Sequence, residues 1–420
     1  MKRTRSRYLR MGGAVATIAS LAVVAAGCSN SASDPDSPIV WEMWGGQESD
    51  IKNSEDQLRI AQEENPDLKV DLSMSPYDGY FTKLTAGMSS QQLSCILTMN
   101  GQNMADYHEA FSPLSKEDLA VAGIDESEFT ANSFDLMRVD GELYGIPWDV
   151  AAMLVYVNED ALAQAGQTVP ALDWTFDDFD ALATSMTGGD IYPFAVDTGD
   201  LQWQTLPIAR AGTQPVTEDY TLDLTNPDYL ASAEWYASLV DTGAAAPVPS
   251  AAESVWGSDQ FTSQRAAMVV EGTWNALNFL NNDAGFETVF LPVPAGPEGS
   301  LAILLGSGYG ISSTCENREA ALKVLGSLVG EAAQDSIAES GRSLPARLSS
   351  QEIYYESIPE PARTEIRAAF EASFAGAQNW RTAPDWQQMV SALQPELISV
   401  FNGQKTMTSL LEQMQDRFGE

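Results

Sequence analysis

The chain has 420 residues, of which 44% are hydrophobic, and its formal net charge is −37. A chain of this length exceeds the usual size of a single hydrophobic core, so two lobes are expected. A body this acidic repels nucleic acid and anionic lipid surfaces and disfavours negatively charged substrates. The composition therefore favours a neutral ligand.

The first 27 residues are organised like a secretory signal peptide. Five basic residues within the first ten positions precede an uncharged segment over 11–26, which is shorter than the ~20 residues of a membrane span. The segment ends in "VAAGC", which resembles the lipobox of bacterial lipoproteins. The resemblance implies cleavage before Cys28 and lipid on its thiol. We therefore expect a leader over 1–27 and a lipid-anchored chain at the outer face of the cytoplasmic membrane.

A Ser-, Pro- and Asp-rich tether over 28–38 leads into alternating strands and helices. We expect strands at 38–44, 69–75 and 95–100, with helices at 49–68 and from about residue 80. This alternation predicts a parallel α/β sheet, in which ligands bind beyond the carboxyl ends of strands. The rule points to Gln47 after the first strand, and to Asn100 and Gln102 at the end of the third.

The remaining elements follow the same pattern. Extended runs flank Pro147 and Asp149, and capped amphipathic patterns predict helices at 176–186 and 226–243. A strand turns at Gly272 into a helix within 264–280, and a glycine-rich strand covers 306–315. Helices dominate beyond residue 317.

The residue types argue against a metal site and a nucleophilic enzyme. One histidine, His108, cannot build a His-rich zinc site, the cysteines show no CxxC spacing, and no GxSxG motif is present. We expect no catalytic residue, metal or cofactor. Cys95 and Cys315 either pair, as an exported compartment permits, or stay separate as buried thiols.

The order of motifs resembles the extracellular solute-binding proteins of ABC transporters, in the carbohydrate branch that includes maltose-binding protein. The resembling segments span nearly the whole mature chain: the lipobox, "IVWEMWGG", "NPDLKVDLSMSPYDGYFTKLTAGMSS", "DGELYGIPWDVAAMLVYVNEDALAQAG", "DWTFDDFDALA", "FTSQRAAMVVEGTWN", "FLPVPAGPEGS" and "GSGYGISSTCENREAALKVLGSLV". One stretch, "SSQQLSCILTMN", departs from the Gly-Asp-x-Pro-Asp-Val-like run that the family usually carries before its third strand.

The resemblance implies a two-lobed periplasmic-binding-protein-like fold, with mixed, mostly parallel sheets and a hinge. The first lobe would comprise 39–149 and 307–350, and the second 150–306 and 351–420. A monomer of this family binds a sugar or oligosaccharide between closing lobes and delivers it to the permease subunits of an ABC importer. Its returning strand lies antiparallel to the third strand, which would place Cys95 and Cys315 at disulfide distance.

A sugar presents apolar faces and hydroxyl edges, so its site combines aromatic platforms with amides and carboxylates. In the family, residues in the places of Trp274 and Trp386 stack on sugar rings, whereas Trp41 and Trp235 fit the core. The predicted ligand site consists of Trp44, Gln47, Asn100, Gln102, Trp148, Asp149, Trp274, Asn275, Gly306, Ser307 and Trp386.

Two other functions stay open from the sequence. A secreted glycoside hydrolase needs two carboxylates about 5 to 9.5 Å apart, and the 59 Asp and Glu residues do not exclude such a pair. A binding protein for a peptide or an amino acid usually offers an arginine to the carboxylate, and Arg210 or Arg381 could serve. The ten tryptophans favour the sugar.

Overall fold

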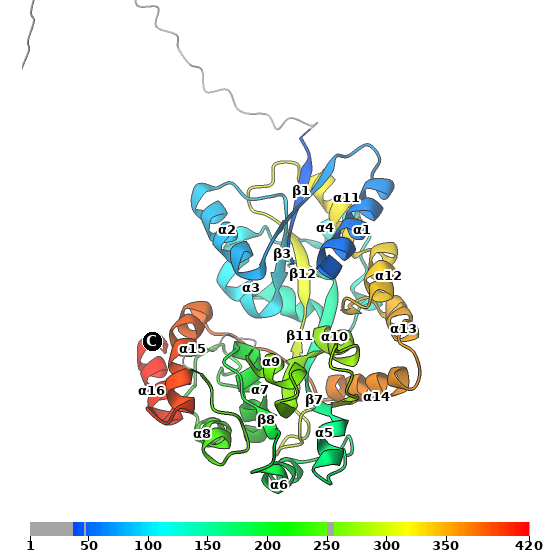
Figure 1. The fold of residues 1–420 in the computed structure, drawn as a ribbon. Coiled ribbons are helices and arrows are strands. Elements are labelled where there is room, and N and C mark those ends of the chain that lie inside the picture. The colour runs from blue at the N-terminus through cyan, green and yellow to red at the C-terminus, as the bar shows by residue number, and fades with distance from the viewer. Residues whose placement is uncertain (1–36, 46–47, 250–255, 420) are drawn as a thin grey trace, which may run out of the picture. The chain divides into compact units, whose positions relative to one another are not determined.

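The computed structural model describes residues 37–45, 48–249 and 256–419 (Figure 1). The predicted leader, the predicted lipid-anchor position Cys28, nearly all of the predicted tether and the predicted ligand residue Gln47 lie outside these ranges. Within them, no helix combines the length and the apolar character needed to cross a membrane.

The first lobe is built on a five-stranded sheet with the order β2-β1-β3-β12-β6. The strands are β1 (Ile39–Trp44), β2 (Val70–Ser75), β3 (Ile96–Asn100), β12 (Ser307–Ile311) and β6 (Ile146–Pro147). Strands β1, β2 and β3 are parallel, whereas β12 runs antiparallel to β3, with Ile311 opposite Ile96. The predicted return of a late strand beside the third strand is therefore confirmed.

Helices cover this sheet on both sides (Figure 1). Their bounds are α1 (Glu48–Glu64), α2 (Tyr77–Ser90), α3 (Gly101–Tyr107), α4 (Lys116–Ala122), α11 (Arg318–Val329) and α12 (Glu331–Ser340). Helix α1 ends four residues earlier than expected because Asn65 and Pro66 follow it, and a proline pushes the preceding residue out of helical conformation. Helix α2 starts directly after Pro76, about three residues earlier than expected.

The second lobe is built on a seven-stranded sheet. Its main path is β14-β11-β7-β9-β8, and β10 and β13 also pair with β7. The strands are β7 (Asp149–Asn158), β8 (Tyr192–Ala195), β9 (Ala266–Gly272), β10 (Thr288–Leu291), β11 (Ile303–Leu305), β13 (Leu344–Pro345) and β14 (Gln378–Asn379). Its helices and those of the C-terminal part are α5 (Glu159–Gln164), α6 (Phe176–Met186), α7 (Asp200–Ala211), α8 (Pro227–Asp241), α9 (Trp256–Thr262), α10 (Ala276–Leu280), α13 (Leu348–Glu356), α14 (Ala362–Ala375), α15 (Trp386–Phe401) and α16 (Met407–Phe418).

Strand β7 shows why this sheet is so apolar. All ten of its residues are buried. Leu154 and Tyr156 belong to one cluster of buried side chains, which continues into the first lobe. Met153, Val155 and Val157 belong to a second cluster on the opposite face. Because both faces of the sheet are covered, the strand is apolar from Val150 to Val157, between Asp149 and Asn158 at its two ends, and does not alternate with polar residues.

The chain passes from one sheet to the other at Trp148, between β6 and β7, and again at Gly306, between β11 and β12. The two crossings lie side by side, because the Trp148 N–H donates to the Ser307 carbonyl at 2.9 Å. A Cβ on residue 306 would lie 2.7 Å from the Asp149 carbonyl oxygen, so this close approach requires glycine. The full lobe ranges, including the boundary at 350, stay a prediction.

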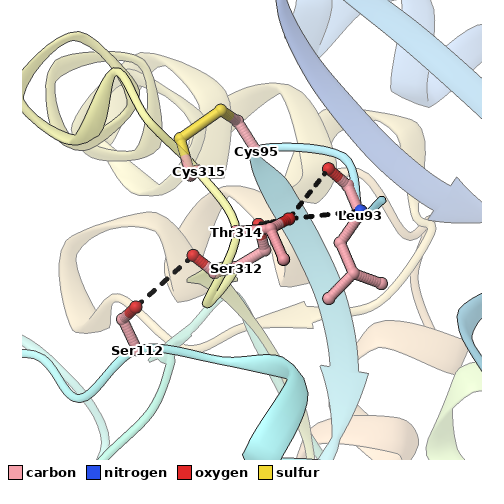
Figure 2. The surroundings of a disulfide bond; sticks show 6 residues. All are labelled: Leu93, Cys95, Ser112, Ser312, Thr314 and Cys315. Atoms are coloured by element: carbon pink, nitrogen blue, oxygen red, sulfur yellow. Dashed lines mark hydrogen bonds between the residues drawn. A yellow bond between two sulfur atoms is a disulfide. The ribbon is translucent and has the colours of Figure 1, made fainter. Parts of the chain in front are cut away.

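A disulfide joins Cys95 and Cys315, whose Cα atoms are 4.6 Å apart (Figure 2). Cys95 precedes β3 and Cys315 follows β12. Around the bridge, the Ser312 N–H donates to the Cys95 carbonyl at 2.9 Å, and the Leu93 N–H donates to the Thr314 hydroxyl at 3.2 Å. The pairing implied by the family resemblance is thus present, at the end of β3 opposite to Asn100.

Removal of this bridge with Cys95→Ala and Cys315→Ala should lower the free energy of unfolding by up to about 5 kcal/mol, because the bridge closes a loop of 220 residues. Urea denaturation measures the change. Ligand affinity should stay the same, since the bridge lies away from the carboxyl end of β3. Two reactive thiols besides Cys28 in the unfolded, unreduced wild type would contradict the pairing.

Candidate ligand site

On the first lobe, the carboxyl ends of β1 and β3 bring an aromatic ring and an amide together. The Trp44 ring contacts the edges of Tyr77 and Tyr80, with centroids 5.5 and 5.2 Å away. Asn100 donates from Nδ2 to the Tyr77 hydroxyl at 2.6 Å. Its buried Oδ1 has no hydrogen-bond partner among the described residues, so this oxygen keeps an unused capacity to accept a hydrogen bond.

Tyr77 is a residue that the sequence analysis missed. Its side chain is 44% exposed, and its ring leads through Phe81 to Tyr107 along one strip of aromatic contacts. The missed signal was its position at the start of α2, directly after a strand end. Gln102 lies half-buried in α3, and Trp44 is 8% exposed. Tyr77 therefore offers more accessible aromatic surface than the predicted Trp44.

At the crossings, the Asp149 carboxylate joins separate segments. Its Oδ1 accepts from the Ser307 N–H at 2.6 Å, and its Oδ2 accepts from the Ser343 hydroxyl at 2.8 Å. Burial raises the pKa of Asp149 to about 6, although these hydrogen bonds and the charge of Arg342 act in the opposite direction. Both oxygens are engaged by the protein, so we assign Asp149 to holding the crossings together.

Trp148 is packed inside the same region. Its side chain is 2% exposed, and its ring stacks on Tyr309 with centroids 5.8 Å apart and an interplanar angle of 10°. A ring covered in this way supports the backbone at the crossing, and we infer that its contact with a ligand is at most peripheral. Ser307 is half-buried at the start of β12, and the Gly306 carbonyl accepts from the Gly101 N–H at 2.8 Å.

On the second lobe, two buried carboxylates organise the loops that follow β8 and β9. Asp197 accepts backbone N–H groups of Thr198, Gly199 and Gly257, at 2.7, 2.9 and 2.7 Å. Burial, together with the charge of Glu271, raises the pKa of Asp197 to about 7. The sequence analysis did not single out Asp197, although its position after a strand in "AVDTGD" was the same signal that selected Asn100.

Glu271 is the second of these carboxylates. It accepts from Gln202 Nε2 at 3.1 Å, from the Ser258 hydroxyl at 3.0 Å and from the Gly272 N–H at 2.8 Å. Burial raises its pKa as well. Because α7, α9 and the turn after β9 all donate to these two carboxylates, the charges fix the shape of the second lobe at the carboxyl ends of its parallel strands β8 and β9.

Trp274 and Asn275 follow this turn. Both are half-buried, and the Trp274 ring lies so close to Gly272 that a Cβ there would fall 2.2 Å from it. The glycine thus lets the indole approach the backbone closely. Asn275 accepts from Asn278 at 3.0 Å. Trp274 is the predicted residue whose environment fits an aromatic platform best.

Trp386 has a different environment. Its side chain is 1% exposed, the indole N–H donates to Asp200 Oδ2 at 2.9 Å, and the ring meets the edge of Trp380 at 5.5 Å. In this structure protein atoms cover both faces, so the expected stacking role does not fit the geometry. Burial raises the pKa of Asp200 to about 6. The indole instead joins the start of α15 to the start of α7.

The arginines considered for a peptide or amino acid ligand are engaged elsewhere. Arg210 lies 4.4 Å above the Trp235 ring and pairs with Asp180 at 3.3 Å. Arg381 donates from Nε to the Val216 carbonyl at 3.0 Å. Over the described ranges, no group of three His, Cys, Asp or Glu side chains is placed to hold a metal ion. The site thus consists of aromatic rings, amides and hydrogen-bonded carboxylates.

The model of the bacterial extracellular solute-binding protein family matches residues 51–335. The chain belongs to this family. A maltooligosaccharide ABC transporter solute-binding lipoprotein of Streptococcus pneumoniae is 22% identical over 433 residues, which cover 96% of each chain.

Solved structures agree on the two-lobed fold of this solute-binding protein. An ABC substrate-binding protein of Listeria monocytogenes in complex with cycloalternan superposes with a TM-score of 0.80 at 21% identity, covering 90% of this chain and 97% of that one. The GacH receptor of Streptomyces glaucescens, solved unliganded and with acarbose, superposes with a TM-score of 0.75 at 18% identity. The superposition covers 90% of this chain and 97% of that one. UgpB of Mycobacterium tuberculosis in complex with glycerophosphocholine superposes with a TM-score of 0.75 at 19% identity, covering 91% of this chain and 97% of that one.

The raised pKa of Asp149 makes the stability of the solute-binding protein depend on pH. A folded-state pKa of about 6 lies above the ordinary value of 3.8 for an aspartate, so the folded protein binds this proton more tightly than the unfolded chain. The corresponding stability is fully present below pH ~4 and is lost as the pH rises through 6. Asp149→Asn keeps the shape of the side chain but removes its ionisation. This substitution should therefore remove about 3 kcal/mol from the pH dependence of the free energy of unfolding.

Urea unfolding of the wild type and Asp149→Asn between pH 4 and 8 tests the expectation, with the exposed Asp67→Asn as the matched control. The difference between wild type and Asp149→Asn should grow with pH in favour of the variant. Parallel curves for the two proteins would show that Asp149 titrates as it does in the unfolded chain.

Proposed function

We propose that this extracellular solute-binding protein captures a neutral oligosaccharide between its two lobes and delivers it to the permease of an ABC importer. In this proposal the lipid on Cys28 holds the mature, monomeric chain at the outer face of the cytoplasmic membrane. The protein binds its ligand without converting it.

One observation carries the choice of a sugar. Aromatic rings lie at the carboxyl ends of strands in both sheets, Tyr77 on the first lobe and Trp274 on the second, and the Asn100 Oδ1 without a hydrogen-bond partner lies beside Tyr77. Such a pairing suits a ring with apolar faces and hydroxyl edges. The engagement of Arg210 and Arg381 leaves less support for a peptide or an amino acid. The family membership supports binding over hydrolysis.

The relatives support the same class of ligand. Those from Listeria monocytogenes and Streptomyces glaucescens were solved with cycloalternan and acarbose, and that from Streptococcus pneumoniae is named for maltooligosaccharides. A ligand would bind the closed arrangement of the lobes more tightly than the open one, because only the closed arrangement allows contacts to both lobes at once.

Incubation with a panel of labelled oligosaccharides tests the function. We expect saturable quenching of tryptophan fluorescence by at least one neutral oligosaccharide, with no shortened product after prolonged incubation. Release of shorter chains would instead identify a glycoside hydrolase. Saturable binding of an amino acid or a peptide, with no response to any sugar, would show that the ligand is not an oligosaccharide.

Trp274→Ala and Tyr77→Ala should each weaken the affinity for the selected oligosaccharide by about 1–3 kcal/mol, on the scale of base stacking on aromatic side chains. Titration calorimetry measures the change. Trp274→Phe should retain most of the wild-type affinity, in contrast to Trp274→Ala, because it keeps an aromatic face. Tyr220→Ala removes a ring that is 58% exposed in a turn and serves as the control. Wild-type affinity in a folded Trp274→Ala protein would return this residue to a packing role.

A further inference from the structure

Helix α3 of the first lobe lies against the start of α15 of the second lobe. Met104 of α3 packs in the cluster that includes the first sheet, whereas Met389 of α15 packs in the cluster on the far face of the second sheet. Two hydrogen bonds cross between the helices. The Gln387 N–H donates to Asp106 Oδ2 at 3.1 Å, and Gln387 Nε2 donates to Asn103 Oδ1.

The first bond supplies a cap that α15 does not have from its own segment. The first turn of any helix leaves N–H groups without intrahelical partners. The N-cap residue of α15, Asp385, has φ of 60° and forms no side-chain cap hydrogen bond. Asp106, which comes from the other lobe, accepts one of these N–H groups, and its negative charge suits the positive end of the helix dipole.

The second bond involves a buried partner. Asn103 is 3% exposed, and it lies three residues after Asn100, the first-lobe residue with a free carbonyl oxygen. On the other side, Trp386 precedes Gln387 and is tied to Asp200, which follows the Asp197 loop. Two consecutive residues of α15 are therefore bonded to the helices that follow Asn100 in the first lobe and Asp197 in the second.

We propose that Asp106, Asn103 and Gln387 form a latch that favours the closed arrangement of the lobes and sets how long a ligand stays bound. The part that concerns the ligand rests on the proposed function. The latch is polar, and a hollow of about 580 Å³ lies beside it, lined by Tyr107, Gln387, Gln388, Ser391, Ala392 and Arg417. Water can therefore replace its hydrogen bonds, and each lost bond should shift the opening equilibrium about fivefold.

The adjacent residue Gln388 offers a matched control. Its side chain is exposed and bonds within its own helix, from Nε2 to Asp385 Oδ1 at 2.6 Å. Gln387→Ala and Gln388→Ala thus remove the same group from consecutive positions of α15, and only the first removes a bond between lobes. Any loss of helix propensity or side-chain entropy is common to both variants.

Electron–electron distance measurements on the ligand-free mature chain with Cys28→Ser test the latch. Spin labels go on Val121→Cys of the first lobe and Leu172→Cys of the second, which are 45% and 39% exposed. Gln387→Ala and Asp106→Ala should each raise the ratio of open to closed populations about fivefold, and Gln388→Ala should leave it unchanged. Melting temperatures identify any variant that has lost its fold.

Unchanged distance distributions in folded Gln387→Ala and Asp106→Ala would overturn the latch. A second arm uses maltotriose as the probe in stopped-flow fluorescence, where Gln387→Ala should raise the dissociation rate about fivefold and leave the association rate unchanged. If maltotriose does not bind the wild type, this counts against maltotriose as a ligand of the proposed function, and the distance measurement still decides the latch.

Discussion

Asp149 provides the interaction on which the geometry of the protein depends. Two of the points at which the chain crosses between its sheets lie side by side, and the Asp149 carboxylate accepts the backbone N–H of Ser307 at the second of them. Gly306 lets the two backbones approach, and its carbonyl accepts from Gly101 at the start of α3. The crossing thereby positions the carboxyl end of β3, where Asn100 bonds to Tyr77. A carboxylate buried at such a point resists ionisation, which couples the crossing to pH.

The second lobe uses buried charge in a similar way. Asp197 and Glu271 together accept hydrogen bonds from α7, α9 and the turn after β9, so strong acceptors hold these segments in addition to their apolar packing. Burial raises the pKa of both carboxylates, and the charge of Glu271 raises that of Asp197 further. The two carboxylates accept hydrogen bonds from groups of the protein itself. In the proposed function, recognition of the ligand falls to the residues that the loops present, Trp274 foremost.

The start of α15 connects the candidate ligand site with the closure of the lobes that is expected of a binding protein. A helix whose first turn is capped from the other lobe is most stable when the lobes are closed, because opening exposes its N–H groups and leaves Asp106 without this partner. Trp386 on the same turn is held by Asp200. Binding affinity in such a protein depends on the closing equilibrium as well as on ligand contacts, since only the closed form makes contacts to both lobes.

The sequence by itself determined the elements whose signals are local. The capping box of Thr175 and Asp178 marks the start of α6, and the predicted range 176–186 is correct, since both partners lie within one turn. Alternation of strands and helices placed Asn100 at a strand end, and the resemblance to a family indicated the pairing of Cys95 with Cys315. Only the tertiary structure decided how accessible each side chain is. Trp386 loses its ring faces to Trp380 and neighbouring atoms, Tyr77 gains exposure at the start of α2, and Asp197 meets Glu271 because two distant strands lie side by side. Burial depends on which segments pack together, and no local pattern encodes that.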